Sequence, residues 1–192
     1  PKAPTSFILA SASARRRELL IELLDDYEVT VADVEELSSH PDGSTALVMV
    51  NARLKALAIA RQQPGAWVLG ADTLVALGNE VLGKPCDLEE AFSMLRILSG
   101  KTHEVSTGLC LVHLDDGYEE TRVETSKVTF RELDDAVIEE YFAEVNPLDK
   151  AGAYAIQKRG ELIVESFEGS RSNVIGLPLE LLGQWFRDLG IS

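Results

Sequence analysis

The stretch "FILASASARRRELL" (residues 7–20) decides the fold of this region. It begins with four apolar residues typical of a strand, crosses a short polar loop and enters a run with helical spacing. The run predicts a helix over 15–24, with Leu19, Leu20, Leu23 and Leu24 on its apolar face. A strand followed by a tight loop and a helix forms an anion site, because the first helical N–H groups are unpaired and the helix dipole adds positive charge there.

The side chains of this loop have two interpretations. Ser11 and Ser13 could donate hydroxyl hydrogen bonds to a phosphate that Arg15 or Arg16 grips in bidentate fashion. Alternatively, the serines cap the helix and the arginines are solvated. Arginine at a helix N-terminus opposes the dipole, and a bound phosphate would offset that cost. Local physics leaves both interpretations open.

The rest of the chain alternates between strand and helix patterns. "DLEEAFSMLRILSG" (87–100) predicts a helix that Asp87 caps and Gly100 ends, and Ser44 or Thr45 is the expected cap of an earlier helix. The other expected helices cover 44–63, 134–145 and the segment that Pro178 opens; the expected strands cover 27–34, 67–77, 102–114, 118–131, 153–157 and 161–167. Interleaved elements with one long antiparallel pair predict an α/β fold on a mixed sheet.

Composition narrows the function classes. The chain has 192 residues, 45% of them hydrophobic and 26% charged, which fits one globular domain over 1–192. A net charge of −14 argues against nonspecific nucleic-acid binding, which requires a basic face. Cys86 and Cys110 lie too far apart for a disulfide framework or a metal motif, so a reducing, cytoplasmic setting is expected. No apolar run approaches the length of a membrane span, and no signal region is recognisable.

Several charged residues stand at the ends of predicted strands or in tight loops. Asp72, in "GADT", ends an apolar strand, where it is either a turn former or a functional group at the edge of the sheet. Glu35 and Glu36 follow an earlier strand, and two carboxylates at strand ends could hold Mg²⁺ beside a substrate phosphate. Lys84, in "GKP", and Lys55, in a long helix, could serve as cations or as ordinary surface side chains.

Six motifs occur in a fixed order: "LASASARRRELL", "GADT", "GKP", "LSGKTHEVSTG", "DKAGAYAIQ" and "NVIGLPLE". In this order they resemble the Maf family of nucleoside triphosphate pyrophosphatases. The resemblance covers about residues 7–189. It implies an α/β fold similar to that of inosine-triphosphate pyrophosphatase, with an elongated mixed sheet, two lobes and a deep cleft between them.

The resemblance also implies an activity and a set of site residues. Maf proteins are housecleaning enzymes that hydrolyse a nucleoside triphosphate to the monophosphate and pyrophosphate with Mg²⁺ or another divalent cation such as Mn²⁺. By motif match, the site residues are Ser11, Ser13, Arg15 and Arg16 for phosphate; Asp72, Lys84 and Lys55 for catalysis; Glu36 and Asp72 for metal; and Arg15, Thr73 and Gln157 for base preference. Either Glu35 or Glu36 could be the metal-side carboxylate, and Asp72 could be the base or a metal ligand.

Two details separate this chain from its possible relatives. The family usually has Pro where this chain has Ala14, which removes a restraint on the loop but no donor.

"GADT", "DKAGAYAIQ" and "SNVIGLPLE" resemble the subfamily that prefers dTTP and UTP. The alternative is the sister subfamily that prefers 7-methyl-GTP, which usually has Ser-Asp-Gln at 71–73 and Glu at 157. A non-catalytic regulator of septum formation is a further alternative, and the resemblance suggests a homodimer.

Overall fold

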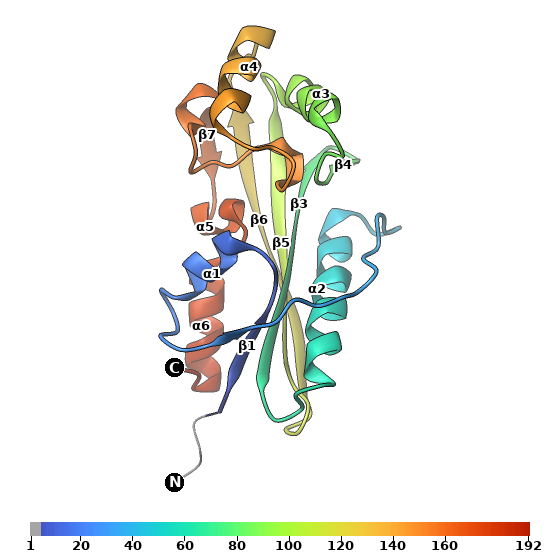
Figure 1. Ribbon diagram of the computed structural model, residues 1–192, viewed down its shortest axis with the longest axis vertical. Coiled ribbons are helices and arrows are strands. Elements are labelled where there is room, and N and C mark those ends of the chain that lie inside the picture. The colour runs from blue at the N-terminus through green and yellow to red at the C-terminus, as the bar shows by residue number, and fades with distance from the viewer. Residues whose placement is uncertain (1–4) are drawn as a thin grey trace.

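The computed structural model describes residues 5–192. Three long strands run the length of the molecule and helices cover both of their faces (Figure 1). The strands are β1 (Phe7–Ala10), β2 (Glu28–Val29), β3 (Trp67–Leu77), β4 (Glu80–Leu82), β5 (Thr102–His113), β6 (Tyr118–Phe130) and β7 (Val164–Glu168). The helices are α1 (Ala14–Leu20), α2 (Ser44–Ala60), α3 (Leu88–Leu98), α4 (Asp135–Glu144), α5 (Arg171–Ile175) and α6 (Leu179–Leu189), with 3₁₀ turns at Ala151–Ala153 and Gly160–Leu162.

One mixed sheet joins all the strands in the order β2-β1-β3-β5-β6-β7, and β4 also pairs with β3. β1 runs parallel to β2 and β3, whereas β3, β5, β6 and β7 form an antiparallel series. This arrangement confirms the expected α/β fold on a mixed sheet. The expected long antiparallel pair is β5 and β6, which are in register from Thr102 opposite Thr129 to His113 opposite Tyr118.

Several sequence predictions about the bounds, the caps or the presence of elements were wrong. The strand expected over 27–34 contains only the two residues of β2, and α1 ends at Leu20 instead of continuing to 24. Gly43, with φ of 94°, stands at the N-cap of α2, so neither Ser44 nor Thr45 caps that helix. "AYAIQ" (153–157) is not a strand, because its backbone makes a tight turn in which Ala153 has φ of 67°. By contrast, the Asp87 carboxylate does cap α3, accepting from the Glu90 N–H at 2.8 Å.

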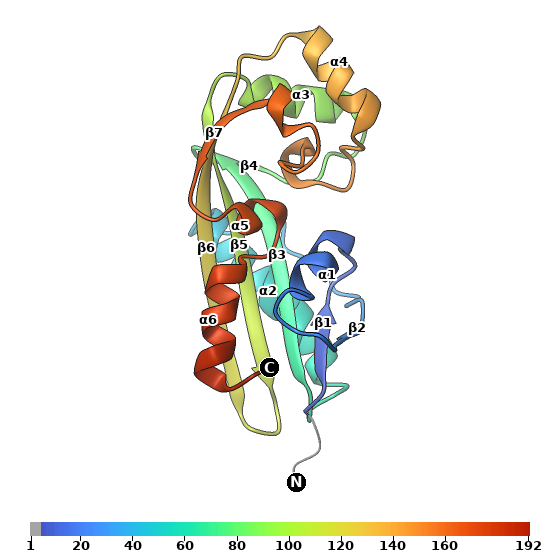
Figure 2. The same cartoon turned by 90° about the vertical axis from the view of Figure 1, so that its left-hand side faces the viewer.

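Three buried clusters form the core. One cluster packs α3 and α4 against one end of the long strands, with Leu95, Phe130 and Tyr141 fully buried. At the other end of the sheet, a second cluster packs α1 and α6 on one face and a third packs α2 on the opposite face. The side view separates the two ends, with α3 and α4 at one end and α1 and α6 at the other (Figure 2). The two ends of one sheet are therefore the two lobes.

Two glycines let α2 lie unusually close to the sheet. A Cβ on Gly70 would meet the Ala52 carbonyl oxygen at 2.2 Å, and one on Gly108 would meet the Val48 carbonyl oxygen at 2.4 Å. Both contacts are with backbone, which cannot move aside cheaply. The close approach brings the polar side chains on this face of α2 within reach of β3.

The free energy of unfolding should decrease as the pH is lowered, because of His103. This side chain is only 1% exposed and lies in the core under α3 and α4. Burial lowers the pKa of His103 from 6.5 to about 4, so the unfolded chain binds the proton more tightly than the folded one. The stability that comes from keeping His103 neutral is fully present above pH 6.5 and is lost as the pH falls toward 4. Between pH 7 and 4.5 we expect a loss of about 2 kcal/mol in the free energy of unfolding.

Chemical denaturation at both pH values measures this loss, and the His103→Gln variant isolates it. Because carboxylates also titrate in this range, the informative quantity is the difference between the wild type and the variant. An equal loss in both proteins would show that His103 does not titrate as its burial requires.

Candidate active site

The edge of β3 is unpaired over a short stretch in the middle of the molecule. On that edge β1 pairs with Trp67–Gly70 and β4 pairs with Val75–Leu77, while β5 covers the other edge continuously. The four residues between them are "ADTL" (71–74), so the peptide edge beside Asp72 and Thr73 has no strand partner. The loop that follows β1 and the loop that follows β4 flank this gap. Residues from both faces of the sheet can therefore meet there.

The loop after β1 is held in shape by its own hydroxyl groups. Ser11 is 6% exposed, and its Oγ accepts from the Ser13 N–H at 3.2 Å. The Ser13 Oγ accepts from the Arg16 N–H at 3.3 Å and so caps α1. The capping interpretation therefore holds for Ser13. Each hydroxyl keeps its hydrogen for a further acceptor, so the two serines remain available to an anion.

Arg16 is fixed between the loop and the sheet. Its Nε donates to the Gly176 carbonyl at 2.8 Å, and its two terminal nitrogens donate to the hydroxyls of Thr73 at 3.0 Å and Ser11 at 3.4 Å. Thr73 in turn lies 2.8 Å from the Thr107 hydroxyl, which donates to the Asn173 carbonyl at 3.2 Å. This chain of hydrogen bonds orients the guanidinium. Thr73 contacts Arg16 directly, so its side chain helps to position the loop after β1.

Arg15 reaches across to the other lobe. Its terminal nitrogens lie 3.3 Å from the Asp149 carbonyl oxygen and 3.5 Å from the Asp149 carboxylate. Asp149 is held by the buried Lys150, whose Nζ lies 2.6 Å from the carboxylate. Burial opposes ionisation of Asp149, but its bonds to Lys150 and Arg15 leave its pKa below the usual value. Arg15 is thus a charged link between the two lobes.

Two carboxylates and an ammonium meet on the α2 face of the gap. Lys55 Nζ lies 2.5 Å from Glu36 Oε1 and 3.5 Å from Asp72 Oδ1, and it donates to the Ala71 carbonyl at 3.1 Å. Asp72 is 8% exposed, and its other oxygen accepts from Asn51 at 3.1 Å. Glu36, and not Glu35, is therefore the carboxylate beside Lys55. The carbonyl of Ala71 is one of the edge groups that no strand partners.

Asn51 is a site residue that the sequence analysis missed. It is 2% exposed, one helical turn before Lys55, and its amide pairs with both the N–H and the carbonyl of Leu37, at 2.8 and 3.0 Å. These bonds fix the loop that carries Glu36 beside Lys55. The signal for Asn51 was a polar residue on the buried face of α2. Asn173 and Thr107 are two further buried residues that the sequence analysis missed.

The charges of the site act on one another. Burial lowers the pKa of Arg16 from the usual arginine value, the positive charge of Arg15 lowers it further, and the carboxylates of Asp72 and Glu36 raise it. The two faces of the gap are therefore electrostatically connected: the arginine on one side faces the carboxylates on the other. An anion bound there would add negative charge beside Arg16 and favour its charged form.

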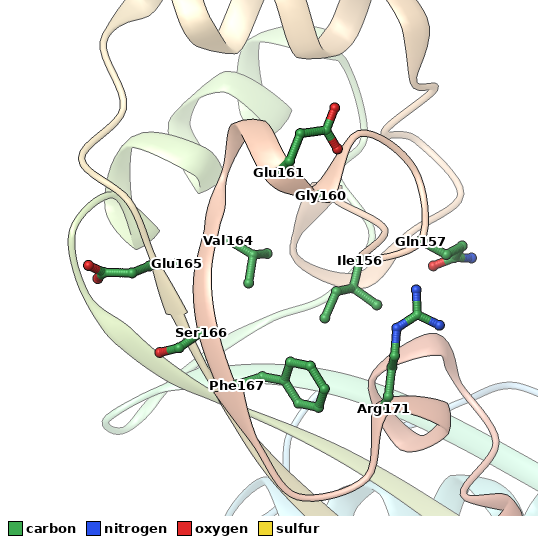
Figure 3. Close-up of a pocket in the computed structure, with 9 residues that line it drawn as sticks. All are labelled: Ile156, Gln157, Gly160, Glu161, Val164, Glu165, Ser166, Phe167 and Arg171. Carbon is green, nitrogen blue, oxygen red and sulfur yellow. The ribbon is translucent and has the colours of Figure 1, made fainter.

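Among residues 5–192, Lys84 and Gln157 form no hydrogen bond or ion pair with this cluster. Lys84 is exposed on the loop after β4, and within residues 5–192 it forms no ion pair. Continuing the register of β3 and β4 by two residues would bring it level with Thr73. Gln157 belongs to the turn that replaces the expected strand, and its Oε1 is buried with no partner among the described residues. It lines a separate cavity with Arg171 (Figure 3).

The donor set at the gap fits a divalent cation only together with a ligand. Across residues 5–192, no three histidine, cysteine, aspartate or glutamate side chains are grouped to hold a metal ion. Glu36 and Asp72 offer two carboxylates, and Mg²⁺ characteristically binds through one or two carboxylates with substrate phosphates and water. The residues present therefore fit a cation that arrives with a polyphosphate.

Across residues 5–192, no helix is long and apolar enough to cross a membrane.

Comparison with known proteins gives a consistent result. The profile of the Maf family, described as "Maf-like protein", matches residues 6–189. The chain is 51% identical over 175 residues to a dTTP/UTP pyrophosphatase of Myxococcus xanthus, covering 91% of this chain and 88% of that protein. It is 44% identical over 183 residues to the protein of the same name from Thermococcus gammatolerans, covering 95% and 96%.

Among solved structures, the fold is similar to that of two Ham1 proteins. The Staphylococcus aureus protein aligns with a TM-score of 0.56 at 14% identity, covering 96% of this chain and all of that chain. The Coxiella burnetii protein aligns with the same TM-score at 16% identity, covering 96% and 99%. At these identities the likeness concerns the fold alone. It agrees with the expected architecture.

Proposed function

The chain belongs to the Maf family, and on that premise we propose that it hydrolyses dTTP and UTP to the nucleoside monophosphate and pyrophosphate. The observation that carries the proposal is the cluster at the open edge of β3. There Ser11 and Arg16 lie on one side, and Lys55, Asp72 and Glu36 lie on the other. Cations and hydroxyls facing carboxylates suit a polyphosphate that is attacked by water. Relatives 41–51% identical over more than 90% of this chain carry the name dTTP/UTP pyrophosphatase.

The phosphate loop would bind the outer phosphates. Ser11, Ser13, Arg15 and Arg16 supply hydroxyl and guanidinium donors, and charge-assisted hydrogen bonds to phosphate are the strong ones. Arg16 is already oriented by Gly176 and Thr73. A fixed donor needs no reorganisation when charge develops on the leaving pyrophosphate. The cut between the α and β phosphates follows, because the outer phosphates are the ones that this loop holds.

The carboxylates would act at the α-phosphate. Asp72 would accept a proton from the attacking water, and Asn51 and Lys55 hold its two oxygens in place. Lys55 and Lys84 would balance negative charge on the transferring phosphoryl group. Glu36 and Asp72 would hold Mg²⁺ or Mn²⁺, which when bound supplies Lewis-acid neutralisation of the phosphate oxygens. In the structure the ammonium of Lys55 lies between these two carboxylates, which shows that a positive charge is accommodated at this position.

Base preference would depend on Arg15, Thr73 and Gln157. The neutral amide of Gln157 can both donate to and accept from a pyrimidine edge, whereas a carboxylate would suit a cationic methylated guanine. Thr73 would act through Arg16, to which it is hydrogen-bonded. A homodimer, which the family resemblance suggests, stays a prediction for this chain.

A panel of triphosphates tests the function. We expect dTTP and UTP to be cleaved with pyrophosphate release well ahead of dATP, GTP and 7-methyl-GTP. A good bidentate contact to a base edge discriminates by about 1–3 kcal/mol, so kcat/KM should differ by one to two decades. Pyrophosphate is measured directly and, after added pyrophosphatase, as phosphate. Should 7-methyl-GTP be the best substrate, the chain would belong functionally with the sister subfamily. Release of phosphate and nucleoside diphosphate would contradict the proposed cut.

A further inference from the structure

A cavity of about 620 Å³ opens between β7, α5 and the turn that carries Gln157 (Figure 3). Its volume lies within the range of small-molecule sites. None of the residues clustered at the open edge of β3 lines it, whereas Gln157 does. The cavity is therefore separate from that cluster, and its own side chains indicate what it can bind.

The lining combines apolar walls with one cation, Arg171, and two carboxylates, Glu161 and Glu165. Ile156, Val164 and Phe167 supply apolar surface, and Phe167 is 40% exposed. Arg171 rises from α5 toward the turn with Gln157. Within residues 5–192 its guanidinium forms no hydrogen bond or ion pair, although the chain carries a net charge of −14. An aromatic face and an unpaired fork of donors in one cavity suit a flat ring that carries carbonyl oxygens.

The cavity lies at a suitable distance from the phosphate loop. Arg171 is the first residue of α5, and Gly176 caps the other end of that helix. At 1.5 Å per residue the two are about 7.5 Å apart. The Gly176 carbonyl accepts from Arg16 Nε, so α5 connects the cavity to the arginine of the phosphate loop. A sugar of a nucleotide could span this separation, with its phosphates at Arg16 and its base in the cavity.

We propose that this cavity receives the pyrimidine base and that Arg171 selects uracil and thymine against cytosine. The inference rests on the proposed function. A guanidinium only donates hydrogen bonds, and uracil and thymine present an O4 acceptor. Cytosine presents an amino donor at the same position, which would leave donor facing donor. Phe167 stacks on the ring without distinguishing the bases, because every base has a π face.

The test compares UTP with CTP as substrates of the wild type, Arg171→Ala and Arg171→Gln. In the wild type UTP is preferred, and in Arg171→Ala the ratio of the two kcat/KM values falls roughly ten- to hundredfold through loss of UTP turnover. Glutamine both donates and accepts, so Arg171→Gln accepts either base with a ratio near one. Phe167→Ala raises KM for both substrates equally.

Arg61→Ala is the matched control, since Arg61 is also exposed and forms no ion pair in the described part of the chain. It keeps the wild-type ratio, and unchanged melting temperatures exclude misfolding. Equal preference for UTP and CTP in the wild type, or a ratio that Arg171→Ala leaves unchanged, overturns the proposal. Calorimetric binding of UMP and CMP gives the same comparison without turnover. An enzyme that cleaves neither dTTP nor UTP therefore refutes the proposed function separately from the cavity.

Discussion

Replacing Asp72 with Asn should lower kcat for dTTP by about 10²–10⁴, which is the usual contribution of a general base. The substitution keeps the shape of the side chain and removes its basic oxygen. Asp72 is buried between Asn51 and Lys55, and Asn can still bond to Asn51, so the fold should change little. Steady-state pyrophosphate release gives kcat, and the melting temperature reports on the fold.

The control for this variant is Asp26→Asn, which removes the same charge from an exposed position outside the site. It should retain wild-type activity. The alternative role of Asp72, as a metal ligand only, predicts a different response to cation. In that case raising Mg²⁺ should restore much of the activity, whereas a missing base cannot be replaced in this way. Activity of Asp72→Asn close to that of the wild type would exclude both roles.

Removing divalent cations should lower turnover at least about a hundredfold. Lewis-acid neutralisation of phosphate contributes several kcal/mol to the transition state, and each 1.36 kcal/mol is a factor of ten in rate. In the proposed site Glu36 and Asp72 would face a triphosphate in a chain of net charge −14, so repulsion between carboxylates and phosphates would oppose binding without a cation. Excess EDTA on the wild type tests this, with activity restored by Mg²⁺ or Mn²⁺.

The melting temperature without nucleotide is the control for EDTA. The melting temperature should not change, because the hydrophobic clusters packed around the sheet hold the fold together. Within residues 5–192, no group of three metal-ligating side chains is present to do so. Full turnover in metal-free buffer would contradict the proposed role of the two carboxylates. A collapse of stability in EDTA would instead indicate a structural metal.

The sequence alone determined those features that depend on neighbouring residues. The cap of α3 lies three residues from the N–H that it accepts from, and the long hairpin of β5 and β6 is encoded by two strand-forming runs joined by a short turn. The strand, loop and helix at β1 and α1 were predicted for the same reason. Local patterns singled out most of the candidate site residues, and the resemblance of the six ordered motifs to one family assigned their roles and added Thr73 and Gln157.

Only the tertiary structure decided how those residues meet. Lys55 and Asp72 are brought together because Gly70 and Gly108 let α2 lie against the sheet, and Arg16 is oriented by Gly176, 160 positions away. The unpaired edge of β3 arises from where β1 and β4 end, which strand periodicity does not encode. The physical reason is that caps and periodicity act over a few residues, whereas burial and hydrogen bonding between distant segments depend on packing of the whole chain.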